Sequence, residues 1–294
     1  MRYSLKQLEV FLKVAHYQNI SKAALDLAMS QSAVSSSLSD FERHYDIQLF
    51  DRNGKKLQLN ELGRALRPQA QALFEQAQAF EQGLAQQSSI PALRVGATLT
   101  IGNYLAVGIM AAYMKQYAGA QVQLHVANTA SISAQVENFE LDIGLIEGEL
   151  QNPELHVFPW REDELVVFCS PTHPLAKRKS LSDKDLLGAT WILRESGSGT
   201  RQTFDRAMTG LLSQINVALE LEHTEAIKRA VEADLGISCL SRVALSDAFA
   251  RGSLVPLKVA QRDFRRHFYF IHHRQKYLSA AIENWVALCK KERE

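Results

Sequence analysis

The stretch Asn19–Phe50 constrains the fold more than any other part of the chain. Its sequence, NISKAALDLAMSQSAVSSSLSDFERHYDIQLF, predicts two short helices joined by a tight turn. Ser21 is expected to cap the first helix, because a serine hydroxyl accepts a hydrogen bond from the backbone of the first turn. The apolar stripe of that helix is expected to consist of Ala24, Leu25 and Ala28.

The second helix is predicted to follow Ser30, which is also a good N-cap. Its apolar residues recur at helical spacing and need a core to pack against: Ala33, Val34, Leu38, Phe41 and Tyr45. The opposite face carries only hydrogen-bonding side chains, namely Gln31, Ser32, Ser35, Ser36 and Ser39. A face of this kind fits water or the groove of a nucleic acid.

The flanking segments favour the groove of a nucleic acid over water as the partner of this face. An apolar helix precedes the pair, with Leu5, Leu8, Phe11, Leu12 and Ala15 on one side. A basic turn that contains Gly54 follows, over Asp51–Leu59, and is typical of two short strands. A helix, a helix-turn-helix and a two-stranded wing together form the winged DNA-binding module.

Residues Leu5–Gly63 resemble the LysR-type transcriptional regulators almost position by position, including SQSAVS at Ser30–Ser35. Further segments resemble the branch of that family that contains the YeiE-type and CysB-type regulators: DELVVF at Asp163–Phe168, WILRESGSGTR at Trp191–Arg201, EAIKRAVEADLGISCLS at Glu225–Ser241 and IHHRQKYLS at Ile271–Ser279. The resemblance implies a regulator that binds promoter DNA as a homodimer or homotetramer, contacts RNA polymerase and responds to a small effector without a cofactor.

The module also predicts which side chains contact DNA. Gln31 can pair with an adenine edge in the major groove. The hydroxyls expected to reach bases or phosphates are those of Ser21, Ser32, Ser35 and Ser36. The basic side chains expected at phosphates or in the minor groove are those of Arg52, Lys55 and Lys56. Many relatives carry Pro and Arg where this chain has Ser32 and Ser36, so the operator sequence cannot be carried over.

Composition limits the other possibilities. A chain of 294 residues with 46% apolar content is long enough for about two domains, and its net charge of +1 leaves DNA affinity to local basic clusters. Cys169, Cys239 and Cys289 have no metal-ligand spacing, so no metal site is expected. The N-terminus has no apolar signal core and no stretch approaches a membrane span, which predicts a cytoplasmic protein.

Asn60 is a good N-cap for a long helix that is expected to run to about Gln87. Leu66, Leu73 and Phe80 recur every seven residues, as in a coiled-coil seam. A second copy of the chain is the expected partner of this seam, and the alternative is packing against the chain's own effector domain. Gln86–Pro91 then breaks the helix and is predicted to form a hinge.

From Ala92 onward, predicted strands alternate with predicted helices, which indicates parallel sheets with crossover helices. Strands are expected at 93–97, 122–126, 142–146, 155–160, 164–170, 190–193, 218–221, 237–240 and 268–271. Helices are expected at 102–117 and 129–138, from Ser182, Thr200 and Thr224, and at the end, to about Lys291. The repeated pattern predicts an α/β domain with two lobes, and the family resemblance implies the periplasmic-binding-protein type.

The complete predicted organisation therefore has three parts. Residues 1–59 form the winged helix-turn-helix domain, 60–90 the linker helix with its hinge, and 91–294 the effector domain. Lobe I is expected to comprise 91–162 and 267–294, and lobe II 163–266, with the chain crossing near Arg161–Asp163 and Arg265–His267.

The effector is expected between the lobes, because open α/β sheets bind ligands beyond the carboxyl ends of their strands. Polar residues at such ends are Thr98, Thr100, Asn103, Asn128, Thr129, Ser196, Ser198 and Thr200. Neutral donors at helix N-termini suit a small oxyanion, and the sulfur metabolism associated with the resembled branch points to sulfite or sulfate. Glu147, after the strand at 142–146, is expected to accept a proton from sulfite and to repel sulfate, or else to lie on the rim.

Other functions have weaker support. Neither a phosphate loop with the Gly-Lys-Ser/Thr ending nor a Gly-x-Ser-x-Gly elbow is present, and GSGT alone is not specific, so no catalytic residue is assigned. His272 and His273 are adjacent on a predicted strand and point to opposite faces, which argues against shared metal binding. An organic acid or an amino acid is the alternative effector. A small-molecule-binding protein or enzyme without DNA function is the remote alternative.

Overall fold

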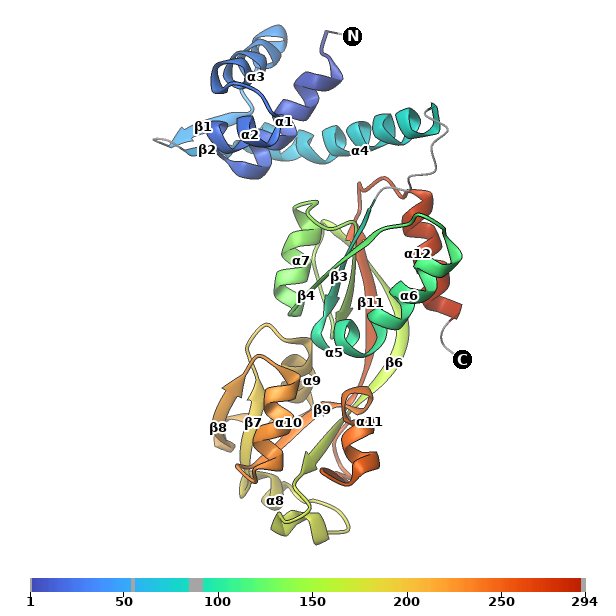
Figure 1. Cartoon of the computed structure of the whole chain (residues 1–294). Coiled ribbons are helices and arrows are strands. Elements are labelled where there is room, and N and C mark those ends of the chain that lie inside the picture. The colour runs from blue at the N-terminus through green and yellow to red at the C-terminus, as the bar shows by residue number, and fades with distance from the viewer. Residues whose placement is uncertain (1, 54–55, 85–91, 292–294) are drawn as a thin grey trace. The chain divides into compact units, whose positions relative to one another are not determined.

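The computed structural model describes residues 2–53, 56–84 and 92–291, and it leaves out the side chains of 52, 53, 56 and 82–84 (Figure 1). The chain divides into two compact units. The N-terminal unit comprises residues 1–89 and 275–279, and the α/β unit comprises 90–274 and 280–294. The finer division predicted above, including the limits of the two lobes, stays a prediction.

The N-terminal unit is a helical module with a short antiparallel hairpin. Its elements are α1 (Leu5–Tyr17), α2 (Ile20–Asp26), α3 (Gln31–Tyr45), β1 (Phe50–Asn53), β2 (Lys56–Leu59) and α4 (Glu61–Leu84). The helices α1, α2 and α3 share one core, in which Val10, Phe11, Val14, Ala23 and Val34 are fully buried. A bond from the amide of Leu57 to the carbonyl of Gln18 (3.1 Å) ties the hairpin to the end of α1.

The start of α2 differs from the prediction. Asn19, not Ser21, caps the helix, because its side-chain oxygen accepts from the amide of Lys22 at 3.0 Å. Asn19 is as good a cap as serine and comes first, so Ser21 lies inside the first turn. The predicted apolar stripe was also wrong: Leu25 is 85% exposed and Ala28 follows the helix with a φ of 51°, while Ala23, Ala24 and Leu27 are buried.

The caps of α3 and α4 are confirmed. Ser30 Oγ accepts from the amide of Ala33 (3.1 Å), and Asn60 Oδ1 accepts from the amide of Gly63 (2.8 Å). The buried face of α3 is narrower than predicted, since Val34 and Leu38 are buried but Ala33 and Tyr45 are exposed. The predicted hinge at 86–91 lies outside the described residues.

The α/β unit has two lobes, each built around three parallel strands of one continuous mixed sheet, and helices cover both faces of the sheet in each lobe (Figure 1). Lobe I holds β3 (Leu93–Thr98), β4 (Val122–Ala127), β5 (Ile143–Glu147), α5 (Leu99–Ile101), a π-helix (Gly102–Ala106), α6 (Val107–Gln116), α7 (Thr129–Glu137) and α12 (Ala280–Lys291). Lobe II holds β7 (Thr190–Arg194), β8 (Asn216–Leu221), β9 (Ile237–Ser241), β10 (Val255–Leu257), α8 (Asp183–Leu187), α9 (Gly199–Ala207), α10 (Thr224–Glu232) and α11 (Arg242–Arg251).

Two long antiparallel strands connect the lobes, β6 (Leu155–Cys169) and β11 (Arg265–His273). The first part of β6 pairs with β11, and its last part pairs with β9 and β10. The strand β11 continues into lobe I, where it pairs with β5. Two separate strands were predicted over the length of β6. The structure has one, because pairing of Arg161 and Asp163 with Phe268 and Arg266 carries the strand across the polar stretch between them.

Each lobe has its own aromatic core. Trp160 and Trp285 are buried in lobe I with α6 and α12, and Trp191 is buried in lobe II with α9. All three tryptophans of the chain therefore lie in the α/β unit. Cys169 and Cys239 are buried free thiols.

The remaining differences concern element boundaries. The helical run of lobe I begins at Leu99, directly after β3, and not at Gly102. Neither α11 nor β10 was predicted, because Arg242–Leu257 mixes polar and apolar residues without a clean period. Of the helices that the structure describes, none is both long and apolar enough to cross a membrane.

Candidate DNA-binding and effector sites

The exposed face of α3 is the candidate DNA-reading surface of the N-terminal unit. Gln31, Ser32 and Ser36 are exposed and Ser35 is half-buried, on the side away from Val34 and Leu38. Ser32 Oγ lies 3.0 Å from the Oγ of the cap residue Ser30, at the first turn of the helix. Ser21 is exposed on α2.

The structure locates the basic residues of the wing only in part. The hairpin pairs Arg52 with Leu57 and Asn53 with Lys56, so Arg52 and Lys56 lie near its tip, but their side chains are outside the description. Lys55 lies outside the described residues altogether.

The predicted seam residues of α4 have different surroundings within the N-terminal unit. Leu66 packs partly against the core, next to the buried Ala70. Leu73 and Phe80 are 47% and 69% exposed. Only the later part of the seam therefore presents large apolar side chains at the surface of this unit.

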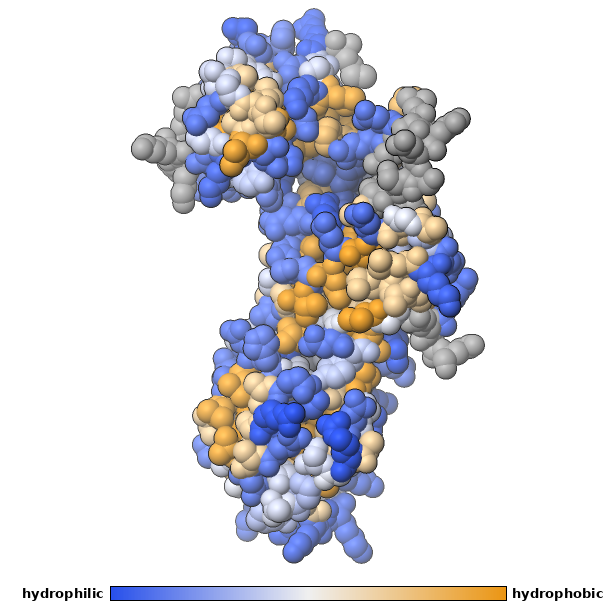
Figure 2. Space-filling view, viewed as in Figure 1, coloured by the Kyte–Doolittle hydropathy of each residue, from blue (hydrophilic) through white to orange (hydrophobic). Residues whose placement is uncertain are grey.

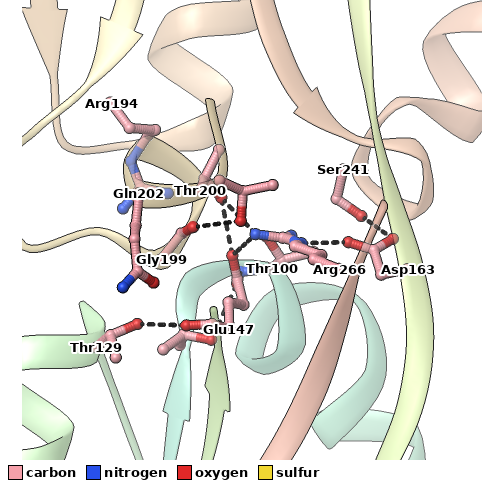
Figure 3. A network of polar contacts seen from close by, with 12 residues as sticks. Thr100, Thr129, Glu147, Asp163, Arg194, Gly199, Thr200, Gln202, Ser241 and Arg266 are labelled. Carbon is pink, nitrogen blue, oxygen red and sulfur yellow. Dashed lines mark hydrogen bonds and ion pairs between the residues drawn. The ribbon is translucent and has the colours of Figure 1, made fainter. Parts of the chain in front are cut away.

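In the α/β unit, three of the predicted effector residues, Thr98, Thr100 and Thr200, converge on the carboxylate of Glu147, the last residue of β5 (Figure 3). Glu147 is only 1% exposed. Its Oε1 accepts from the hydroxyl of Thr98 and from the backbone amide of Thr100, both at 2.9 Å. Its Oε2 accepts from the hydroxyl of Thr200 at 2.8 Å and from Nη1 of Arg266 at 2.7 Å. The expectation of a rim position for Glu147 was therefore wrong.

Strand register explains why Arg266 reaches this carboxylate. Phe268 of β11 is the partner of Glu147 in β5. Arg266 precedes Phe268 by two residues, so both side chains lie on one face of the strand, and the guanidinium extends past the end of β5. The same guanidinium donates from Nε to Asp163 of β6 (2.7 Å), and Asp163 accepts in turn from Ser241 at the end of β9 (2.8 Å).

The network sets the charge of Glu147. Burial alone raises the pKa of its carboxyl, but the Arg266 guanidinium and hydrogen bonds from Thr100 and Thr200 outweigh burial and lower the pKa from 4.5 to about 2. Glu147 is therefore ionised at neutral pH. Nη2 of Arg266 is buried and has no hydrogen-bond partner among the described residues.

The backbone of Glu147 also joins the lobes. Its carbonyl accepts from the hydroxyl of Thr129 at 3.0 Å. A Cβ added to Gly199, at the start of α9, would lie 2.0 Å from the same carbonyl oxygen. Next to it, Gly148 has a φ of +79°, and the side chain of Gln202 makes two bonds of 3.0 Å with the backbone of Glu149. The α9 end of lobe II is therefore in close backbone contact with lobe I.

The other predicted residues make no side-chain bond to Glu147. Asn128 caps α7, and its amide nitrogen lies 3.4 Å from Glu195. Asn103 and Ser196 are exposed, and Ser198 is buried without a side-chain bond at the cap of α9. The structure thus brings Thr98, Thr100 and Thr200 to the carboxylate where an oxyanion was expected, with Thr129 behind it.

A second contact between the lobes was not predicted. The hydroxyl of Tyr104 donates to Glu225 of α10. Burial, and after it the Glu225 carboxylate, raise the pKa of Tyr104. The buried amine of Lys228 donates to Glu225 (2.7 Å) and to the carbonyl of Ala244 (3.2 Å). The hydroxyl of Thr224, beside Glu225, is buried and has no partner within the described part of the chain.

A groove of about 1010 Å³ opens on the crossing strands. Its lining includes Asp163 and Arg266 from those strands, Leu105 and Glu149 from lobe I and Ser246 from α11. The groove therefore reaches the Asp163 and Arg266 end of the polar network, whereas Glu147 and its threonine partners are not part of the lining. No group of three or more His, Cys, Asp or Glu residues in the described parts of the chain could hold a metal ion.

Comparison with known families gives two matches that together span nearly the whole chain. Residues 5–64 match the family described as bacterial regulatory helix-turn-helix protein, lysR family, and residues 86–294 match the LysR substrate binding domain. The Escherichia coli protein described as uncharacterized HTH-type transcriptional regulator YeiE is 44% identical over 289 residues, which is 98% of each chain.

Solved structures agree in fold. Full-length OxyR from Pseudomonas aeruginosa matches 99% of this chain and 95% of its own, with a TM-score of 0.76 and 22% identity. The regulatory domain of CcmR from Synechocystis, solved in complex with 2-PG, matches 69% of this chain and 97% of its own, with a TM-score of 0.64 and 28% identity.

Proposed function

The chain belongs to the LysR family of bacterial transcriptional regulators, and from that premise we propose how it recognises DNA and which kind of ligand its α/β unit senses. The helix α3 enters the major groove, Gln31 reads a base edge, and the wing holds the DNA backbone through Arg52, Lys55 and Lys56. The supporting observation is the polar, exposed face of α3, which is supported from behind by the buried Val34 and Leu38.

The test is selection of duplexes from a random pool by gel retention with the full chain, followed by a salt titration of the selected sequence. We expect a defined operator with two half-sites and an affinity that falls steeply with salt. Retention that shows no sequence preference at any salt concentration would refute the assignment of α3.

We propose that the chain works in the cytoplasm as a dimer or tetramer in contact with RNA polymerase. Leu73 and Phe80 on α4 form the first contact between copies. A second self-association surface is supported by exposed apolar side chains over the edge strand β8, where Val217 and Leu219 are 40% and 37% exposed (Figure 2). Sedimentation of the full chain over a concentration series measures both steps.

The proposed effector is a small molecule that binds between the lobes beside Glu147 and Arg266. Two groups there can serve a ligand. Nη2 of Arg266 has no partner among the described residues and can donate. The ionised carboxylate of Glu147 already accepts four hydrogen bonds, so a proton-bearing ligand binds it by replacing one of those donors, such as the Thr200 hydroxyl. A ligand that bridges them needs an acceptor oxygen and a hydrogen-bond donor. Sulfite in its monoprotonated form has both and is our first candidate, whereas sulfate is a bare dianion. The structure of CcmR with 2-PG supports a small ligand in a domain of this type.

Thermal melts of the full chain in sulfite, sulfate, phosphate and chloride at matched ionic strength test the candidate, with tryptophan fluorescence reporting on the α/β unit. A specific ligand at a hundred times its Kd stabilises the folded state by about 2.7 kcal/mol. We expect sulfite to stand out, and Thr200→Val to remove its shift. Thr203→Val is the matched control, because that hydroxyl donates to the carbonyl of Gly199 within the same helix.

Failure of all four anions to produce a specific shift would refute the oxyanion. The candidates would then be an organic acid or an amino acid, whose hydroxyl or ammonium group could donate to Glu147. The DNA-binding proposal does not depend on this result.

A further inference from the structure

We propose that the Glu147 side chain is the resident anion of the effector site, and that removing it creates a binding site for a small monocarboxylate such as formate. The inference deepens the proposed function, and it rests on that proposal only in treating the interlobe site as the effector site. The Glu147 carboxylate would then be the group that holds the hydrogen-bond donors of the two lobes together before any effector binds.

The first support is the set of donors. Two hydroxyls, one backbone amide and one guanidinium nitrogen meet the two carboxylate oxygens at 2.7–2.9 Å. They come from β3, α5, α9 and β11, so both lobes and a crossing strand contribute. This arrangement matches what a free carboxylate needs in a closed cleft, namely charge-assisted bonds to both oxygens.

The second support is the guanidinium of Arg266. It is 3% exposed, its Nε is held by Asp163 and its Nη1 by Glu147 and Thr200, while Nη2 is buried without a partner in the described residues. Without the Glu147 carboxylate, two of its three nitrogens would lack an anionic partner. A buried charge in that condition is costly, so an anion of the right size that enters the vacated space is strongly favoured.

The third support is the division of the bonds between the lobes. Thr98 and Thr100 belong to lobe I, like Glu147 itself, whereas Thr200 belongs to lobe II. The carboxylate therefore fastens α9 to the end of β5 (Figure 3). An effector that binds the Thr200 hydroxyl or Arg266 must replace Glu147 as the acceptor of their hydrogen bonds. This replacement breaks a bond between the lobes, and that is how ligand binding changes their arrangement.

The experiment is complementation of Glu147→Ala in the full chain. The variant and the wild type are melted with increasing sodium formate at constant ionic strength, made up with chloride, and followed by tryptophan fluorescence. Formamide, which has the shape of formate without its charge, is the control. For the variant we expect a melting temperature that rises with the logarithm of the formate concentration, by roughly 5–10 °C when formate is at a hundred times its Kd, and no rise for the wild type or with formamide.

A second variant locates the formate. Glu147→Ala combined with Arg266→Met keeps the space but removes the cation, so formate should no longer raise its melting temperature. A rise of equal size in the double variant or in the wild type would overturn the proposal, because the anion would then act elsewhere. The same conclusion would follow from an equal effect of formamide.

If Glu147→Ala is unfolded in chloride, the same titration becomes a refolding assay. Recovery of the native tryptophan emission with formate, and not with formamide, supports the resident anion. No recovery at molar formate refutes it. A negative result with sulfite on the wild type affects neither outcome, so the two proposals fail separately.

Discussion

Replacing Glu147 with Gln should remove a pH-dependent part of the stability of the α/β unit. The folded-state pKa of this carboxyl is lowered from 4.5 to about 2 by the balance of burial, Arg266 and the threonine hydrogen bonds. This lowering of the pKa corresponds to about 3 kcal/mol of stability, as an order of magnitude, at about 1.36 kcal/mol for each pKa unit. Because the folded pKa is depressed, this stability is fully present above pH 4.5 and is lost as the pH falls from 4.5 towards 2.

The assay is urea unfolding of wild type and Glu147→Gln, followed by tryptophan fluorescence at one fixed protein concentration. Trp160, Trp191 and Trp285 are all buried in the α/β unit, so the signal reports on that unit. At neutral pH the variant should be less stable by about 3 kcal/mol. At about pH 3.5, one unit below the ordinary pKa, the gap should have narrowed by about 1 kcal/mol.

Glu149→Gln is the matched control. Its carboxylate is two residues away, and it pairs with Arg206 on the surface, where its side chain is 65% exposed. Exposed pairs of this kind contribute about 0–1 kcal/mol, so the control should differ little from the wild type at either pH. A gap between wild type and Glu147→Gln that stays constant from neutral pH to about pH 3.5 would show that the carboxylate is not held by Arg266 in its ionised form.

Three further predictions concern DNA binding, assembly and lobe contact. Gln31→Ala should reduce discrimination between operator and mismatched duplex by about 1–3 kcal/mol, measured by gel retention. In the same assay, Lys55→Ala should weaken binding to all duplexes alike and flatten the salt dependence of the affinity by about one unit of slope. Equal losses of affinity for every sequence in both variants would contradict this. Leu73→Asp should abolish the dimer in sedimentation and operator binding with it, with the tryptophan melt unchanged, because an unpaired carboxylate would be buried against its symmetry mate; an intact dimer would place the seam elsewhere. Gly199→Ala should lower the free energy of unfolding in urea by about 1–3 kcal/mol, because the added Cβ would meet a backbone carbonyl. Gly108→Ala on α6 is the control and should be neutral or stabilising, because its Cβ would meet nothing within 4 Å. Equal effects of the two substitutions would mean that the lobes do not touch at Gly199.

Local signals in the sequence predicted the helices of the N-terminal unit well. Ser30 and Asn60 cap their helices as expected, because a cap depends on residues three positions away. The cap of α2 was misplaced because Asn19 and Ser21 are both suitable caps, and the helix begins at the earlier of the two. Leu25 shows the same limit: its spacing fits a buried stripe, but Ala23 and Leu27 occupy the core.

The effector site was predicted in part for a similar reason. Thr98, Thr100, Thr200 and Glu147 follow strands or precede helices, and strand ends can be recognised locally. Arg266 could not be assigned, because its partner Glu147 lies 119 residues away and a buried arginine looks in sequence like an exposed one. Glu147 was therefore expected to face a ligand, whereas Arg266 and the threonines already satisfy it.

The charge of this network limits the class of effector that it can accept. Glu147 and Asp163 are two buried carboxylates that share one guanidinium, that of Arg266. A further negative charge about 4 Å from Glu147 costs about 4 kcal/mol at an effective dielectric constant of about 20, which is roughly a thousandfold in affinity. The repulsion is about twice as large for a dianion as for a monoanion. A monoanion that also carries a proton offsets part of the repulsion by donating a charge-assisted hydrogen bond to the carboxylate. Discrimination between sulfite and sulfate would therefore come from charge more than from shape. Glu147→Gln should accordingly narrow the difference between the two anions in the melting assay, and an unchanged difference would show that charge at Glu147 does not select the ligand.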